Sequence, residues 1–161
     1  MLTVETILQA ETLSLSGVVS SGLGEGCMFT SLPWAASEFE RKLGFIPYPG
    51  TFNLTMTGKK WERGRKRMLT EPGIAIEPAT GFCDAKCFWV VIGEQVAGAV
   101  VIPDISEYPN DKLEILCPVP VRRTLAASDG HEVSIKVALD VNHRCDRDVP
   151  QVASGALGGG Q

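Results

Sequence analysis

The sequence predicts a mainly β fold, a small β-barrel rather than a sheet of alternating strands and helices. Three observations support this fold class: many short strand-like segments, a single clear helical pattern, and turn signals at close spacing. The chain has 161 residues, which is enough for one hydrophobic core. We therefore expect one domain over residues 1–140, followed by a Gly-rich, disordered tail over 141–161.

The expected strands are short runs rich in β-branched and apolar residues, or runs in which polar and apolar residues alternate. In 51–57, Thr and Asn alternate with Phe, Leu and Met, which is the period of a half-buried strand. Turn-forming residues separate the later strands, as in 109–111 (PND) and 128–130 (SDG). The segments expected as strands are 13–19, 51–57, 73–77, 87–92, 97–102, 113–116 and 133–139.

One helix is predicted over 32–43, because its large apolar residues recur near helical spacing. Ser31 with Pro33 would open this helix, and Gly44 would end it. A second, short helix is expected within 121–127.

A basic stretch over 59–67 (KKWERGRKR) follows the second strand and contains six cationic residues. A phosphate or nucleic-acid contact and a solvated surface loop are both open readings, and we favour the loop. The net charge of the whole chain is −4, which argues against broad, sequence-independent nucleic-acid binding. We expect no nucleic-acid partner.

The five cysteines and the N-terminal residues indicate a cytoplasmic protein. An odd number of cysteines without an export signal is typical of free thiols in a reducing compartment. No apolar run reaches the roughly 18 residues of a membrane span, so we expect no membrane partner. Cys83 and Cys87 are spaced as C-x3-C, but no second pair or nearby His completes a zinc set. We favour two small buried residues, with zinc as the alternative.

Residues 21–26 (SGLGEG) form the first candidate functional segment. Three glycines at alternate positions after a strand let backbone amides approach an anion closely. The Gly-Lys-Ser/Thr end of a phosphate loop is absent, as is the helix-opening spacing of a dinucleotide fold. An anion-binding loop and a glycine-rich turn within a barrel are equally open.

Residues 44–54 (GFIPYPGTFNL) form the second candidate segment. Two prolines and two glycines restrict the path of the loop that leads into the strand. Thr51 and Asn53 are two positions apart, so their side chains leave the strand on one face. A hydroxyl and an amide carbonyl suit a hard cation such as Mg²⁺. A pair of polar residues on an exposed face is the alternative.

The two segments lie in this order, eighteen positions apart from Gly26 to Gly44, with a helix between them. In this arrangement the sequence resembles the archaeal-type CTP-dependent riboflavin kinases. The similarity extends over about 13–137. The stretches that carry it are 17–26 (GVVSSGLGEG), 43–54 (LGFIPYPGTFNL), 113–118 (LEILCP) and 128–133 (SDGHEV).

The resemblance implies a six-stranded cradle-loop type β-barrel with one or two short helices. It also implies a phosphotransferase that converts riboflavin to FMN with CTP as donor, CDP as product and Mg²⁺ as the metal. Thr51 and Asn53 would hold the metal. Ser106 and Glu114 would contact the flavin, and Glu114 would either deprotonate the attacking hydroxyl or only bind the substrate. The residues implied to contact the nucleotide are Leu23, Gly24, Glu25, Gly26, Cys27, Met28, Val119, Pro120, Val121 and Arg122.

The chain departs from the family's usual residues at several of these positions. Ser106 stands where a Thr is usual, Glu107 where an aromatic residue is common, and Pro120 where a Lys is usual. These departures concern flavin and nucleotide preference and leave the Thr51–Asn53 pair whole. The alternative function is a non-catalytic flavin- or nucleotide-binding sensor. The segment before the first strand is too short for the helix-turn-helix domain that accompanies some relatives, so we expect a free-standing enzyme.

Overall fold

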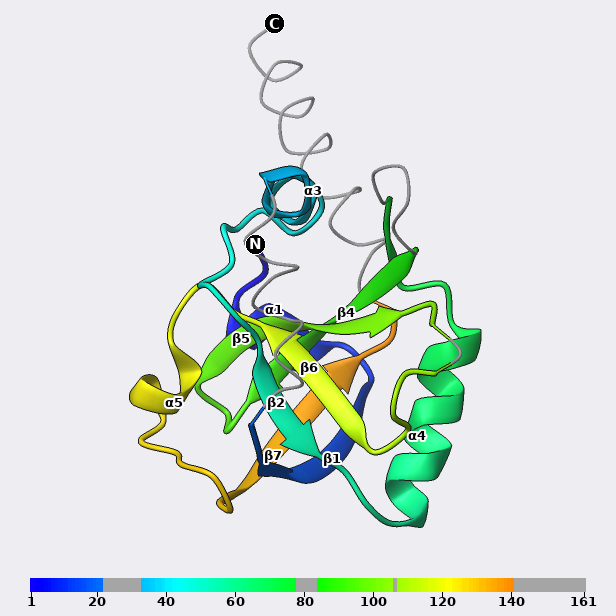
Figure 1. The fold of residues 1–161 in the computed structure, drawn as a ribbon, viewed down its shortest axis with the longest axis vertical. Coiled ribbons are helices and arrows are strands. Elements are labelled where there is room, and N and C mark those ends of the chain that lie inside the picture. The colour runs from blue at the N-terminus through cyan, green and yellow to red at the C-terminus, as the bar shows by residue number, and fades with distance from the viewer. Residues whose placement is uncertain (22–32, 78–83, 106, 141–161) are drawn as a thin grey trace, which may run out of the picture.

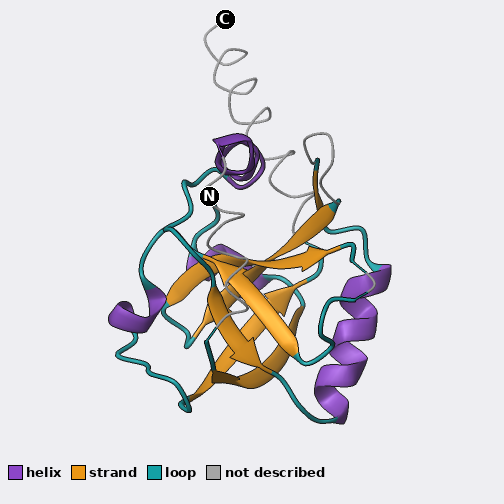
Figure 2. Ribbon diagram, in the orientation of Figure 1, coloured by secondary structure: helices purple, strands orange, loops and turns teal. Residues whose placement is uncertain are grey.

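The computed structural model describes residues 1–21, 33–77, 84–105 and 107–140 (Figures 1 and 2). The helices in these residues are α1 (Val4–Gln9), α3 (Pro33–Leu43), α4 (Lys59–Thr70) and α5 (Val121–Thr124). The strands there are β1 (Thr12–Val19), β2 (Phe52–Thr55), β3 (Ile74–Ile76), β4 (Ala85–Ile92), β5 (Val96–Pro103), β6 (Lys112–Leu116) and β7 (Glu132–Ala138).

The strands form one antiparallel, ring-like sheet in the order β3-β4-β5-β6-β2-β1-β7, with a further pairing between β4 and β7 (Figure 2). One edge of β4 pairs with β5 along the whole strand. Its other edge pairs with β3 in its first half, where Ile74 faces Cys87, and with β7 in its second half, where Ile92 faces Ile135. Six strands thus make the ring and β3 is an addition to it. The mainly β fold class is confirmed.

Two apolar cores lie on the two faces of this sheet. Each strand of the ring contributes alternate residues to the inner core, for example Leu54, Val90 and Ile115. The outer core covers β4 and β5 on the opposite face, where Trp89 packs with residues of α1 and α3 such as Phe39. Strand β4 is buried on both faces, which explains its continuous apolar sequence.

The predicted helix at 32–43 is confirmed as α3 within the described residues. Gly44 ends it in the left-handed region, with φ 78°, and its amide donates to the carbonyl of Glu40 at 2.8 Å. Figure 1 shows α3 at one end of the molecule, away from α4. The side chain of Glu38 ties α3 to the end of β3, because its Oε2 accepts the Glu77 amide at 2.7 Å.

Glu38 predicts an acid-dependent step in stability. Only 8% of the residue is exposed, and burial alone would raise the pKa of its carboxyl. The Glu77 amide and the Arg41 guanidinium outweigh burial and hold the pKa below its usual value. The carboxylate therefore contributes stability above that usual value, and the contribution is lost as pH falls through the lowered pKa.

We expect Glu38→Ala to lower the free energy of unfolding by about 1–3 kcal/mol near neutral pH, because the partly buried hydrogen bond from the Glu77 amide loses its charged acceptor. The difference from wild type should shrink as pH falls through the lowered pKa of Glu38, because the wild-type carboxyl then becomes protonated. Urea unfolding of both proteins at neutral and at acidic pH measures this difference. A difference that is equal at both pH values would contradict the assignment.

Two helices were not predicted, and the preference for a surface loop over 59–67 is wrong. Residues Lys59–Thr70 form α4, a helix of 12 residues. Trp61, Gly64 and Met68 recur along one side and are buried, and Trp61 and Met68 join the inner core. Helix α1 is short and is capped at its N-terminus by Thr3, whose hydroxyl accepts a hydrogen bond from the Thr6 amide at 3.2 Å.

None of the described helices combines the length and the apolar character that a membrane crossing requires. The expected disordered tail over 141–161 lies outside the described residues and stays a prediction. The short helix expected within 121–127 is confirmed as α5.

Candidate functional site

Three side-chain oxygens meet where the chain enters β2. The Thr51 hydroxyl lies 3.2 Å from Asn53 Oδ1 and 3.1 Å from Glu114 Oε1. The Asn53 amide is oriented by its Nδ2, which donates to the Thr51 carbonyl at 2.8 Å. All three residues are partly exposed. We call Thr51, Asn53 and Glu114 the oxygen cluster.

The sheet register brings the oxygen cluster together. Asn53 of β2 faces Glu114 of β6 across an antiparallel pair, so both side chains project from the same face. Their neighbours Phe52, Leu54 and Ile115 point into the inner core and hold the two strands in place. The expectation that Thr51 and Asn53 share one face is confirmed by their direct contact.

Tyr108 completes the hydrogen bonding of Glu114. Its hydroxyl donates to Glu114 Oε2 at 2.7 Å, while the Thr51 hydroxyl contacts the other carboxylate oxygen. Glu114 is therefore held on both sides before any ligand binds. No sequence motif singled out Tyr108, because its position beside the oxygen cluster depends on the pairing of β2 with β6.

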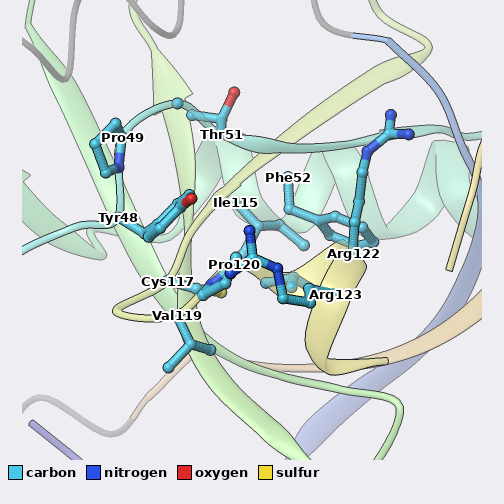
Figure 3. Close-up of a pocket in the computed structure, with 12 residues that line it drawn as sticks. Tyr48, Pro49, Thr51, Phe52, Ile115, Cys117, Val119, Pro120, Arg122 and Arg123 are labelled. Carbon is cyan, nitrogen blue, oxygen red and sulfur yellow. The ribbon is translucent and has the colours of Figure 1, made fainter. Parts of the chain in front are cut away.

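A pocket of about 340 Å³ opens beside the oxygen cluster (Figure 3). Tyr48, Pro49 and Thr51 lie on one side of it, and Arg122 and Arg123 lie on the other (Figure 3). The Tyr48 amide donates to the Cys117 carbonyl at 2.7 Å, which fastens the loop before β2 to the segment after β6. The other lining residues are Gly50, Phe52, Ile115, Cys117, Val119, Pro120 and Val121.

The four residues 119–122, for which a nucleotide contact was implied, thus line one pocket with Thr51. Among the described residues that line it, none is acidic and two are arginines, so the pocket suits an anion. It reaches the oxygen cluster through Thr51, which belongs to both. The pocket could therefore hold a phosphorylated ligand with its phosphates toward a cation at the cluster.

Arg122 connects this pocket to the residues that precede the glycine segment. Its Nη2 donates to the Ser20 carbonyl at 3.1 Å and to Asp129 Oδ1 at 2.6 Å. The Ser21 hydroxyl donates to the other oxygen of Asp129 at 3.2 Å, and the Ser20 amide donates to the Asn53 carbonyl at 3.0 Å. The hydrogen bond from Arg122 lowers the pKa of the Asp129 carboxyl. The chain thus enters the glycine segment beside both the pocket and Asn53.

Some sequence-predicted residues lie outside the described part of the chain. These are the glycine-segment residues Leu23, Gly24, Glu25, Gly26, Cys27 and Met28, together with Ser106 and Cys83. Cys87 and Cys117 are buried free thiols. Burial raises the pKa of Cys87 and raises that of Cys117 to about 12, so neither side chain readily forms the thiolate that binds metals.

The fold and this arrangement define a ring-like β domain with a polar cluster beside an anion pocket. The family model CTP-dep_RFKase, described as domain of unknown function DUF120, matches residues 19–137. The chain belongs to this family.

Several curated relatives are riboflavin kinases. The riboflavin kinase of Methanococcoides burtonii is 40% identical over 134 residues, which cover 79% of this chain and 58% of the relative. Those of Methanosarcina barkeri and Archaeoglobus fulgidus are 36% and 39% identical, over 79% and 80% of this chain and 57% and 56% of the relatives. The chain therefore spans little more than half the length of the curated relatives it matches.

Proposed function

We propose that this chain is a riboflavin kinase that transfers the γ-phosphate of CTP to the 5′-hydroxyl of riboflavin and produces FMN and CDP. The observation that carries the proposal is the oxygen cluster at the edge of a cationic pocket, since phosphate transfer needs a metal-binding set beside an anion site. Family membership and the names of the relatives support the acceptor. The name of the family model supports CTP as donor.

The residues of the cluster fit a divalent cation. Among the described residues, no three His, Cys, Asp or Glu side chains form a metal-binding group, so a cation here would depend on mixed oxygen ligands. The Thr51 hydroxyl and Asn53 Oδ1 are 3.2 Å apart, and both are hard ligands that Mg²⁺ accepts beside water and phosphate oxygens. In this proposal Thr51 and Asn53 hold Mg²⁺, which supplies charge neutralisation at the transferring phosphate.

Glu114 is the proposed partner of the acceptor hydroxyl. In the reaction, a bond forms between the 5′-oxygen of riboflavin and the γ-phosphorus, and the bond from that phosphorus to the β–γ bridging oxygen breaks. The bond electrons leave with CDP, and the hydroxyl proton goes to Glu114. Tyr108 and Thr51 hold the carboxylate at 2.7 and 3.1 Å, so its position is set before the substrate arrives.

The proposed donor site is the pocket of Figure 3, together with the predicted contacts of Leu23–Met28. Arg122 would bind a phosphate through its remaining N–H groups, because both of its hydrogen bonds within the described residues use Nη2. Pro120 adds a rigid apolar wall where a Lys is usual in the family. We extend the proposal to a cytoplasmic location, which the free thiols of Cys87 and Cys117 support.

Arg122→Gln should raise the KM for CTP by about tenfold, since it removes a charged contact with the phosphates. The KM for riboflavin should change by less than about twofold. Arg63→Gln on the exposed side of α4 is the matched control and should behave like wild type. Steady-state kinetics with each substrate varied in turn provide both constants. A tenfold rise in the KM for riboflavin instead of CTP would show that Arg122 contacts the acceptor and not the donor.

The proposed function is tested by incubating the purified chain with riboflavin, Mg²⁺ and each of ATP, GTP, UTP and CTP, and separating the flavins by chromatography. We expect FMN to form, and to form fastest in the mixture that contains CTP. Faster FMN formation with another nucleotide would support the kinase activity but contradict CTP as the donor. If the protein binds flavin but forms FMN with none of the four nucleotides, the chain is a flavin-binding sensor and not a kinase.

A further inference from the structure

Residues 128–133 (SDGHEV) carry part of the resemblance to the kinase family, yet none of them is among the described residues that line the pocket of Figure 3. Residues 128–131 form a tight turn between α5 and β7, which we call the Asp129 turn. The His131 amide donates to the Ser128 carbonyl at 3.0 Å, and the Ser128 amide donates to His131 Nδ1 at 3.1 Å. Gly130 supplies the positive φ, 91°, that its place in the turn requires. These features give the turn a fixed shape.

The Asp129 turn is fastened to the end of β1. The Gly130 amide donates to the Val19 carbonyl at 2.9 Å, and the Val19 amide donates to the His131 carbonyl at 2.8 Å. These two bonds continue the pairing of β1 with β7 up to the turn. The Ser21 hydroxyl then donates to Asp129 Oδ2 at 3.2 Å. Asp129 therefore lies beside the residues that lead into the glycine segment.

Arg122 reaches across from α5 and is held by two acceptors. Its Nη2 donates to Asp129 Oδ1 at 2.6 Å and to the Ser20 carbonyl at 3.1 Å. The side chains of Arg122 and Asp129 are 45% and 59% exposed, and exposed ion pairs contribute little to the stability of a fold. Two acceptors on fixed backbone do restrict the rotamers of a long arginine side chain. The contact is therefore better suited to orienting Arg122 than to stabilising the protein.

The charge of Asp129 also calls for a role, because a carboxylate near an anion site repels the anion. Arg122 lines the pocket and Asp129 does not, so the carboxylate acts on the arginine and not on the space that the ligand would fill. The hydrogen bond from Arg122 lowers the pKa of the Asp129 carboxyl, which keeps the pair charged at neutral pH. Both contacts use Nη2, so the N–H groups of Nε and Nη1 stay available to a phosphate.

We propose that Asp129 is a positioning residue for phosphate transfer, which holds Arg122 in the orientation that binds the phosphates of the nucleotide donor. The inference rests on the proposed function. Asp129 contacts no substrate and acts only through Arg122. Because Ser21 binds the same carboxylate, Asp129 also joins this arginine to the chain where it enters the glycine segment. The Asp129 turn is thus a support for the donor site from outside the pocket.

Asp129→Ala should raise the KM for CTP by about three- to tenfold, because the released arginine must be ordered again each time the donor binds. The kcat and the KM for riboflavin should stay within about twofold of wild type. Asp129→Glu keeps a carboxylate and should restore most of the loss. Glu132→Ala removes another exposed carboxylate that accepts a serine hydroxyl, that of Ser16 at 3.3 Å, and is the matched control with wild-type kinetics.

The decisive comparison combines Asp129→Ala with Arg122→Gln, and calorimetric CTP binding without riboflavin provides a second readout. The double variant should have the CTP KM and Kd of Arg122→Gln alone, because Asp129 has nothing left to position. Effects that multiply, or a folded Asp129→Ala protein that binds CTP as tightly as wild type or more tightly, would overturn the positioning role and leave the kinase intact. Thermal unfolding checks the fold of each variant. A wild-type chain that neither binds CTP nor forms FMN would overturn the proposed function as well.

Discussion

Asn53→Ala should reduce kcat by about 100- to 1,000-fold while the protein stays folded. Asn53 supplies one oxygen of the cluster, and its amide is positioned 3.2 Å from the Thr51 hydroxyl by a bond to the Thr51 carbonyl. Alanine removes this oxygen but preserves the backbone pairing with Glu114 and the apolar neighbours of β2. The loss should therefore appear in turnover and in the dependence on Mg²⁺ rather than in stability.

The measurement is FMN formation at saturating riboflavin and CTP over a range of Mg²⁺ concentrations. Thr57→Ala, an exposed position two residues beyond β2, is the control and should retain wild-type turnover. Wild-type kcat for Asn53→Ala at every Mg²⁺ concentration would remove Asn53 from the metal site. Thermal unfolding checks that the variant keeps its fold.

Glu114→Gln should reduce kcat by about 100-fold or more, because the amide cannot accept the proton of the attacking hydroxyl. Gln keeps the size of the side chain and an oxygen that can accept the bond from Tyr108. The geometry of the cluster should therefore persist without its negative charge. A rise in the riboflavin KM with an unchanged kcat would limit Glu114 to substrate binding.

Tyr108→Phe is the companion variant, because it keeps the Glu114 carboxylate but removes the bond to its Oε2 at 2.7 Å. We expect Tyr108→Phe to lower kcat by less than Glu114→Gln does. Pre-steady-state mixing separates the phosphate-transfer step from release of FMN. A loss for Tyr108→Phe equal to that of Glu114→Gln would make the hydroxyl itself part of the chemistry.

The strands could be predicted because their pattern is local. Alternation along 51–57 and 133–139 places the inner-core residues correctly, and Gly44 ends α3 as predicted. The same alternation puts Thr51 and Asn53 together, and they are in contact. The outer core was less evident, since it depends on how α1 and α3 pack over β4.

Helix α4 was missed for a physical reason. Its buried side consists of Trp61, Gly64 and Met68 only, and Met68 lies just beyond the basic stretch over 59–67. Six cations and a glycine within that stretch hide a narrow apolar stripe, which becomes stable only by packing on the inner core.

Tyr108 could not be predicted either, because its role depends on long-range pairing. The residue lies in the connection before β6, and its partner Glu114 is positioned by β2, from a distant part of the chain. The hydrogen bond from Arg122 to the Ser20 carbonyl and that from Ser21 to Asp129 also depend on the fold, because they join segments that are far apart in the sequence. The resemblance to the kinase family supplied residue roles, and the fold supplied these additional contacts.

The most direct test of the central claim is quantitative analysis of both products in one reaction. The purified chain is mixed with riboflavin, CTP and Mg²⁺, and FMN and CDP are measured together by chromatography over time. Phosphate transfer predicts that FMN and CDP accumulate in equal amounts and that neither forms when riboflavin or the metal is omitted. CDP that forms without FMN, or no product while the folded protein still binds both ligands, would contradict it.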